Sequence, residues 1–330
     1  MAEYNEDAYK LARKAYIQLE VDEAVFDQVV MNSPSVAYAM LRKILESARS
    51  IDQASIDELN EKNQSLQQAY DQLKAAQEKI VEKERLEKEI ELAASVQRSL
   101  LPVELPQYPD YKFAAYLEPA RHVGGDFYDV DTLDDEHVGI VLADVADKGF
   151  HAALFMAVSR TLFLQEGKHS LSPSEVALAV HQGLLDVSAT DDMFVTAFYG
   201  VLHRPTGRLT YIRAAQERPL LFRPGAGITE LPANGRFLGM FDELILVEDE
   251  VTLQPDDRLI IFSDGVPDSV NLADERFGYH RLYEVVQAQG HLPAAALVQQ
   301  IIHALDIWSQ DAEPFDDITL LVLEVSKTPA

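Results

Sequence analysis

The stretch from Ser55 to Leu101 constrains the fold most, because it contains neither glycine nor proline. Glutamate, lysine, glutamine, leucine and alanine dominate it, and all five favour helix. Large apolar residues fall seven apart at Leu59, Leu66, Leu73 and Ile80. Such heptad spacing is typical of the seam of a coiled coil. The stretch therefore predicts a long helix that pairs with a second copy of the chain.

The alternate core positions of this seam are Asn63, Tyr70 and Gln77, and a buried asparagine favours a defined dimer register. After Ile80 the pattern resumes one residue out of phase, which changes the supercoil locally. The second run consists of Leu86, Ile90, Ala93, Gln97 and Leu100. Pro102 ends the helix. The alternative is one solvated amphipathic helix that packs on its own domain.

The chain divides into three parts by sequence pattern. Residues 1–50 carry helical periodicity, with Ser33 as a cap and Pro34 in the first helical position. They hold too few large apolar residues to form a domain alone. We therefore expect a helical segment at 1–50, a coiled-coil dimerisation linker at 51–101 and one domain at 102–330.

Residues 102–330 predict an α+β domain, because short β-rich runs alternate with grouped helices. The expected strands are "KFAAYLEP", "HVGIVLADV", "MFVTAFYGVLH", "RLTYIRA", "PLLFR", "ITEL", "ILVEDEVTL", "DRLIIFSD" and "DDITLLVLEV". Helices are expected at about 149–167, 173–188, 276–289 and 293–308. The "RPTG" turn between His203 and Arg208 makes its flanking strands antiparallel.

Composition excludes several kinds of partner. A formal net charge of −27 argues against nucleic acid and against anionic membrane surfaces. The chain has no cysteine, so thiolate metal sites and disulfides are excluded. The sequence contains no run of about 18 or more apolar residues, so it predicts no membrane span. We expect a cytoplasmic protein whose partners are proteins or cations.

Strongly apolar runs meet aspartates at four places in this domain. The carboxylates are Asp126, Asp144 with Asp147, Asp264, and Asp316 with Asp317. A single such aspartate more often caps a turn. Several together would repel one another unless a hard divalent cation lay between them. Without cysteine or a histidine pair at helical spacing, oxygen-bound Mg²⁺ or Mn²⁺ fits best. Two such ions about 3.5–4 Å apart could activate one water for phosphoester hydrolysis.

The pair Gly124-Gly125 stands directly before Asp126. Two consecutive glycines among β-forming residues mark a place where another backbone or a ligand comes close. A bare β-bulge is the alternative.

The domain also resembles a known family. The motifs are "EIELAASVQRSLLP", "ARHVGGDFYDV", "ADVADKGFHAAL", "MFVTAFYGVL", "SDGVPDS", "FGYHRL" and "DDITLLVLEV". From about Glu87 to Val325 they resemble, in order, the metal-dependent PPM serine/threonine phosphatases of the bacterial SpoIIE-like, RsbU-type branch. The resemblance implies an α-β-β-α sandwich, two antiparallel sheets flanked by helices, with a metal site at one edge.

The resemblance also implies roles for individual residues. The metal ligands would be Asp126, Asp144, Asp264, Asp316 and the backbone oxygen of Val145, holding two Mn²⁺ or Mg²⁺ ions, with a third left open. The residues supporting these ligands would be Gly125, Asp147, Lys148, Gly265 and Asp317, with Asp129 a similar support or a cap. For Asp147 a plain helix N-cap is the alternative. Arg121 is either a phosphate clamp or a surface arginine.

Three positions depart from the family pattern. Ala146 stands where the eukaryotic branch has a histidine, so protonation of the leaving group is unassigned. "AAQERP", with Gln216 and Glu217, replaces the usual "AGHxP" and puts substrate contacts in doubt. Asp268 replaces a glutamate.

The resemblance implies a phosphoserine/phosphothreonine protein phosphatase acting on a phosphorylated regulatory protein of the STAS type, an anti-sigma-factor antagonist. The first alternative is a catalytically inactive scaffold that recruits partners through the coiled coil. The second is a two-metal phosphodiesterase acting on nucleotides, which the net charge disfavours.

Overall fold

The structure is a computed structural model that describes residues 24, 28, 33–187, 193–310 and 312–326. It divides into two compact units, Met1–Arg85 and Leu86–Ala330. Much of the predicted segment at 1–50 lies outside the described residues. The expected domain boundaries at 50 and 101 therefore stay predictions.

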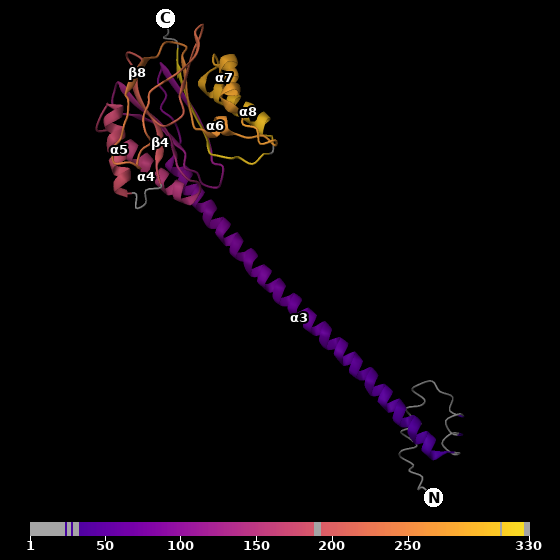
Figure 1. Ribbon diagram of the computed structural model, residues 1–330. Helices are drawn as coiled ribbons and strands as arrows, with labels where there is room; N and C mark the ends of the chain where they lie inside the picture. Colours follow the sequence, from indigo (N-terminus) through magenta and orange to yellow (C-terminus); the bar gives the residue numbers. More distant parts are fainter. Residues whose placement is uncertain (1–23, 25–27, 29–32, 188–192, 311, 327–330) are drawn as a thin grey trace. The chain divides into compact units, whose positions relative to one another are not determined.

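Helix α3 (Pro34–Leu100) is one uninterrupted helix (Figure 1). It begins at Pro34, where the sequence predicts the first helical position, and it ends two residues before Pro102. All four residues of the first heptad run are more than half exposed: Leu59, Leu66, Leu73 and Ile80. The apolar seam is thus uncovered along this part of α3. No described helix combines the length and apolar character that crossing a membrane requires.

The second unit contains two five-stranded sheets in which every neighbouring pair of strands is antiparallel. Sheet one has the order β1 (Tyr111–Glu118), β10 (Ile318–Val325), β9 (Arg258–Phe262), β6 (Leu220–Arg223), β7 (Gly227–Glu230). Sheet two has the order β2 (Phe127–Thr132), β3 (His137–Val145), β4 (Val195–His203), β5 (Arg208–Ala214), β8 (Asp249–Thr252). As predicted, the turn after His203 joins antiparallel strands.

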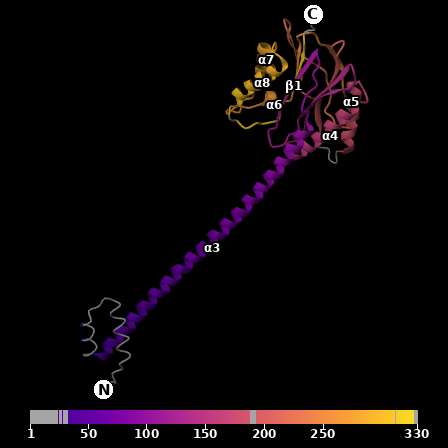
Figure 2. The same cartoon turned by 180° about the vertical axis from the view of Figure 1, so that it is seen from behind.

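The two sheets pack face to face, and helices cover their outer faces (Figure 2). Helices α4 (Phe150–Glu166) and α5 (Pro173–Val187) pack on sheet two. Helices α6 (Gly265–Asp268), α7 (Gly278–Gln289) and α8 (Ala294–Ser309) pack on sheet one. The core between the sheets includes the fully buried Ile140, Phe198 and Leu321. The predicted α-β-β-α sandwich is confirmed.

Strand β2 is the strand that the sequence patterns did not predict. Its sequence, FYDVDT, places two aspartates among its apolar residues. Asp129 is nonetheless buried, because Arg160 on α4 forms an ion pair with it. Asp129 therefore fastens α4 to sheet two. Gly124 and Gly125 precede β2, so the β-bulge alternative is wrong.

Candidate active site

Four chain segments meet at one edge of the sandwich because of how the strands pair. Phe127 at the start of β2 pairs with Ala143 near the end of β3, so Asp126 and Asp144 lie at the same end of sheet two. Phe262 at the end of β9 pairs with Leu320 near the start of β10. Antiparallel pairing therefore brings the segments around Asp264 and Asp316 together at the end of sheet one. Both sheets contribute carboxylates to this edge.

The two glycines allow the segment before β2 to approach its neighbours closely. A Cβ on Gly125 would lie 2.8 Å from the backbone oxygen of Val145, well inside van der Waals contact. A Cβ on Gly124 would lie 2.1 Å from the side-chain oxygen Oδ2 of Asp317. Neither glycine has a left-handed φ, so close approach, and not backbone conformation, requires them. The prediction that another backbone comes close is correct.

Asp317 holds this segment in place. Its carboxylate accepts hydrogen bonds from the backbone N–H groups of Ala120 at 2.8 Å and Gly125 at 2.7 Å. Its own backbone oxygen lies so near Gly265 that a Cβ there would stand 2.0 Å away. Asp317 therefore ties β10, the segment before β2 and the start of α6 together.

The carboxylates at the edge raise one another's pKa. Burial, followed by Asp144 and Asp317, raises the pKa of the fully buried Asp126 well above its usual value. Burial and the charge of Asp264 raise the pKa of Asp144 to about 7. Burial and Asp316 raise the pKa of Asp264 to about 6. Holding these groups ionised together costs free energy that a cation would offset.

The same edge supplies two hydroxyl groups that the sequence analysis missed. Thr319 donates a hydrogen bond to Asp126, and the hydroxyl of Ser263 donates one to the backbone oxygen of Asp317 at 3.2 Å. Both residues lie in motifs that the sequence marks, "DDIT" and "SDG", but nothing in those motifs indicates which groups the hydroxyls contact. The hydrogen bond from Thr319 orients Asp126 inside the sandwich.

The edge is not a preassembled metal cage. In the part of the chain that the structure describes, no three histidine, aspartate or glutamate side chains are already arranged as ligands of one ion. The chemistry of the donor set nevertheless fits a hard cation, because the donors are oxygens and are buried beside like charges.

Lys148 places a positive charge at this edge. Its Nζ lies 2.7 Å from Oδ2 of Asp316 and donates a 2.6 Å hydrogen bond to the backbone oxygen of Phe315. The N-cap alternative for Asp147 is wrong, because Gly149 occupies the N-cap position and α4 begins at Phe150. Asp147 has a left-handed φ of 81° and accepts a hydrogen bond from the N–H of Lys148 at 2.8 Å. It shapes the turn that presents Lys148.

Gln97 near the end of α3 contacts the segment before β2, which the seam pattern did not predict. Its amide donates to the backbone oxygen of Gly124 at 2.6 Å and accepts from the N–H of Gly124 at 3.2 Å. Ala94 is buried beside it against Val123 and Ala153. This end of α3 therefore packs on its own domain. A polar residue within an apolar helical pattern was the signal that could have indicated this contact.

The unusual "AAQERP" segment also has a structural explanation. Gln216 is buried and donates to the backbone oxygen of Phe262 at 3.2 Å, next to Ser263. Its side-chain oxygen accepts a hydrogen bond from Thr196, which pairs with Asp144 across sheet two. Gln216 thus joins the two sheets behind the carboxylates.

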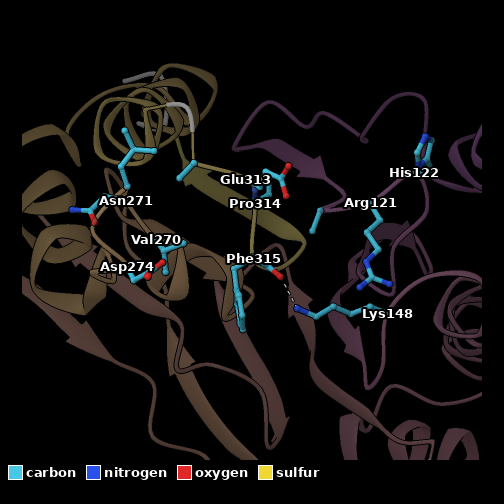
Figure 3. Close-up of a pocket in the computed structure, with 12 residues that line it drawn as sticks. Arg121, His122, Lys148, Val270, Asn271, Asp274, Glu313, Pro314 and Phe315 are labelled. Atoms are coloured by element: carbon cyan, nitrogen blue, oxygen red, sulfur yellow. Dashed lines mark hydrogen bonds between the residues drawn. The ribbon is translucent and has the colours of Figure 1, made fainter.

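A cleft of about 1180 Å³ opens beside the edge (Figure 3). Arg121 and Lys148 lie on one side of it, Val270 and Asp274 lie on the other, and Phe315 lies between them. Arg121 is exposed and forms no hydrogen bond or ion pair with any residue that the structure describes. Its guanidinium group can therefore bind an anion without losing a partner.

Two antiparallel sheets between helical layers, with buried carboxylates from both sheets at one edge, form a PP2C-type fold. Residues 134–326 match the profile of the family described as stage II sporulation protein E (SpoIIE). The chain belongs to the SpoIIE family.

Known proteins agree with this assignment. Protein IcfG of Synechocystis sp. (strain ATCC 27184 / PCC 6803 / Kazusa) is 32% identical over 266 residues, which cover 71% of this chain and 41% of IcfG. Phosphoserine phosphatase RsbU of Bacillus subtilis (strain 168) is 29% identical over 243 residues, which cover 73% of this chain and 71% of RsbU. The SiaA-PP2C domain of Pseudomonas aeruginosa superposes with a TM-score of 0.66 at 20% identity, covering 74% of this chain and 98% of that domain. The chain thus spans less than half the length of IcfG.

Proposed function

We propose that this chain is a metal-dependent phosphatase that removes phosphate from phosphoserine or phosphothreonine on a regulatory protein. The observation that carries the proposal is the group of buried carboxylates from both sheets that raise one another's pKa. Natural proteins keep such a costly arrangement where it has a function. Similarity to phosphoserine phosphatase RsbU also supports hydrolysis of phosphoserine.

The metal ligands in this proposal are Asp126, Asp144, Asp264, Asp316 and the backbone oxygen of Val145. They would hold two Mn²⁺ or Mg²⁺ ions, because hard cations prefer carboxylate and carbonyl oxygens. When bound, such ions supply an activated water and positive charge for phosphoester hydrolysis.

Residues of the chain itself would position the phosphoprotein. The Arg121 guanidinium would bind phosphoryl oxygens from the cleft, since its donors have no other partner among the described residues. Gly125 and Asp317 would keep Asp126 close to Val145. Ala146 carries no acidic proton, so this position cannot protonate the serine oxygen as it leaves.

The substrate class that we propose is a phosphorylated STAS-type regulatory protein. The test is phosphate release from a panel of phosphorylated STAS-domain proteins, with Mn²⁺, with Mg²⁺ and after exhaustive chelation. We expect turnover that needs the metal and returns when the metal is restored. Full turnover with no detectable metal would contradict the proposal. Metal binding without turnover of any phosphoprotein would instead favour the inactive scaffold.

We also propose that α3 forms a parallel coiled-coil dimer through its first heptad run. The observation in support is that Leu59, Leu66 and Leu73 are 59–70% exposed, although leucine is usually buried. The phase slip after Ile80 offers two alternative packings of the helix pair, and a signal that favours one could change turnover.

Insertion of one residue between Val81 and Glu84 would restore a continuous heptad. Analytical ultracentrifugation and turnover should then be compared, and unchanged turnover in a persistent dimer would make the helix a simple tether.

A further inference from the structure

The cleft beside the candidate metal edge has an apolar wall as well as a cationic one. Leu272 and Phe315 line it and are 66% and 57% exposed. Val270 and Pro314 line the same cleft, and Figure 3 shows Phe315 between Val270 and Lys148. Large apolar side chains that gather in a cleft, and are not scattered singly, mark an interaction surface.

Several hydrogen bonds hold the loop that carries Leu272. The side-chain oxygen of Asn271 accepts hydrogen bonds from the N–H groups of Ala273 at 2.9 Å and Glu275 at 3.0 Å. The N–H of Asn271 in turn donates to the backbone oxygen of Glu275 at 3.0 Å. Trp308 also donates to this oxygen from its indole nitrogen, at 3.2 Å. A leucine presented by such a loop loses little conformational freedom when it binds a partner.

Phe315 is fixed from the opposite side of the cleft. The Nζ of Lys148 lies 4.3 Å from the centre of its ring and donates to its backbone oxygen. The next residue, Asp316, is one of the candidate metal ligands. A phosphoserine at the metal edge would therefore bring its neighbouring residues into the cleft that Phe315 and Leu272 line.

We propose that Leu272 and Phe315 form an apolar anchor for the substrate, which binds an aliphatic side chain close in sequence to the phosphoserine. The occupant is a segment of the phosphoprotein because the two walls complement its two parts. Arg121 and Lys148 match the phosphate in charge. On the opposite wall, Val270 and Leu272 match an apolar neighbour, with the polar Asn271 and Asp274 beside them. This inference rests on the proposed phosphatase activity and specifies its sequence preference.

The test uses the full chain with Mn²⁺ and a set of synthetic phosphoserine peptides. Each peptide carries leucine or serine at one of the three positions before or after the phosphoserine. Its kcat/KM is divided by that for p-nitrophenyl phosphate, which has no flanking residues. For the wild type we expect leucine to be preferred about tenfold at one or more positions, mainly through KM. Leu272→Ser should remove this preference, and Leu272→Met should retain it.

Leu178→Ser is the matched control, because Leu178 is 50% exposed on α5 and does not line the cleft. It should keep the wild-type preference. A wild type that hydrolyses the peptides without preferring leucine, or a Leu272→Ser variant that keeps the preference, would overturn the anchor while leaving the phosphatase proposal intact. A wild type that hydrolyses neither the peptides nor p-nitrophenyl phosphate would overturn both.

Discussion

Replacing Asp144 by asparagine should stabilise the metal-free protein. The pKa of Asp144 rises from 3.8 to about 7 in the folded state, because of burial and the charge of Asp264. A difference of about 3 pKa units corresponds to about 4 kcal/mol of unfavourable free energy once the group is fully ionised. Neighbouring carboxylates can take up a proton and relieve part of this cost. We therefore expect a gain of about 2 kcal/mol in the free energy of unfolding at pH 8.

The size of this gain in stability depends on pH. Below pH 3.8 the group is protonated in both states and costs nothing, whereas above about pH 7 the folded state bears the full penalty. The gain from Asp144→Asn should thus be small at pH 4.5 and large at pH 8. Added Mn²⁺ should stabilise the wild type more than the variant, because the variant lacks a ligand carboxylate.

Urea unfolding of both proteins in excess chelator at the two pH values measures this effect. Asp134→Asn is the control of opposite sign, because the N–H of Glu136 lowers the pKa of the exposed Asp134. That variant should lose a little stability at pH 8. The reasoning is refuted if Asp144→Asn is less stable than the wild type at pH 8, or if its gain is equal at both pH values.

Three further substitutions test the edge. Gly125→Ala should lower the free energy of unfolding by about 1–3 kcal/mol, because its Cβ would meet the backbone oxygen of Val145. Urea unfolding that shows no loss of stability would contradict the close approach. Gln97→Leu removes both side-chain hydrogen bonds to Gly124 and should weaken Mn²⁺ binding about tenfold, as measured by calorimetry. An unchanged affinity would mean that Gln97 has a purely structural role. Asp126→Asn should keep the circular dichroism spectrum of the wild type but lose turnover. If the variant retains more than about a tenth of the wild-type turnover, its activation barrier has changed by less than roughly 1.4 kcal/mol, and the site lies elsewhere.

Local patterns predicted most of the sandwich. The predicted helix at 149–167 corresponds to α4 within one residue at each end, and the run "DDITLLVLEV" contains β10. Strand β2 escaped prediction because a buried ion pair, not alternating hydrophobicity, keeps Asp129 in the interior. The local pattern of apolar and polar residues does not reveal an ion-pair partner on another element.

The edge was predictable in its residue types but not in its connections. Aspartates at strand ends were visible in the sequence, yet the hydrogen bond from Thr319 to Asp126 joins residues 193 positions apart. The amide of Gln97 likewise donates a hydrogen bond to Gly124, which lies 27 positions later in the chain. Such contacts depend on which strand lies beside which, and periodicity carries no information about that order.

The position of β10 has a consequence for how the domain is made. It is the last strand among the described residues, yet it lies between β1 and β9, and Asp317 directly before it anchors a segment nearly 200 residues earlier. Until β10 has been synthesised, sheet one lacks the strand that joins β1 to β9, and Gly125 lacks the carboxylate of Asp317. We therefore expect the nascent protein to have no assembled edge until β10 has emerged from the ribosome. Proteolytic removal of the chain from Asp316 onward should likewise prevent assembly of the edge, since it would remove an interior strand of sheet one together with the Asp316–Asp317 pair.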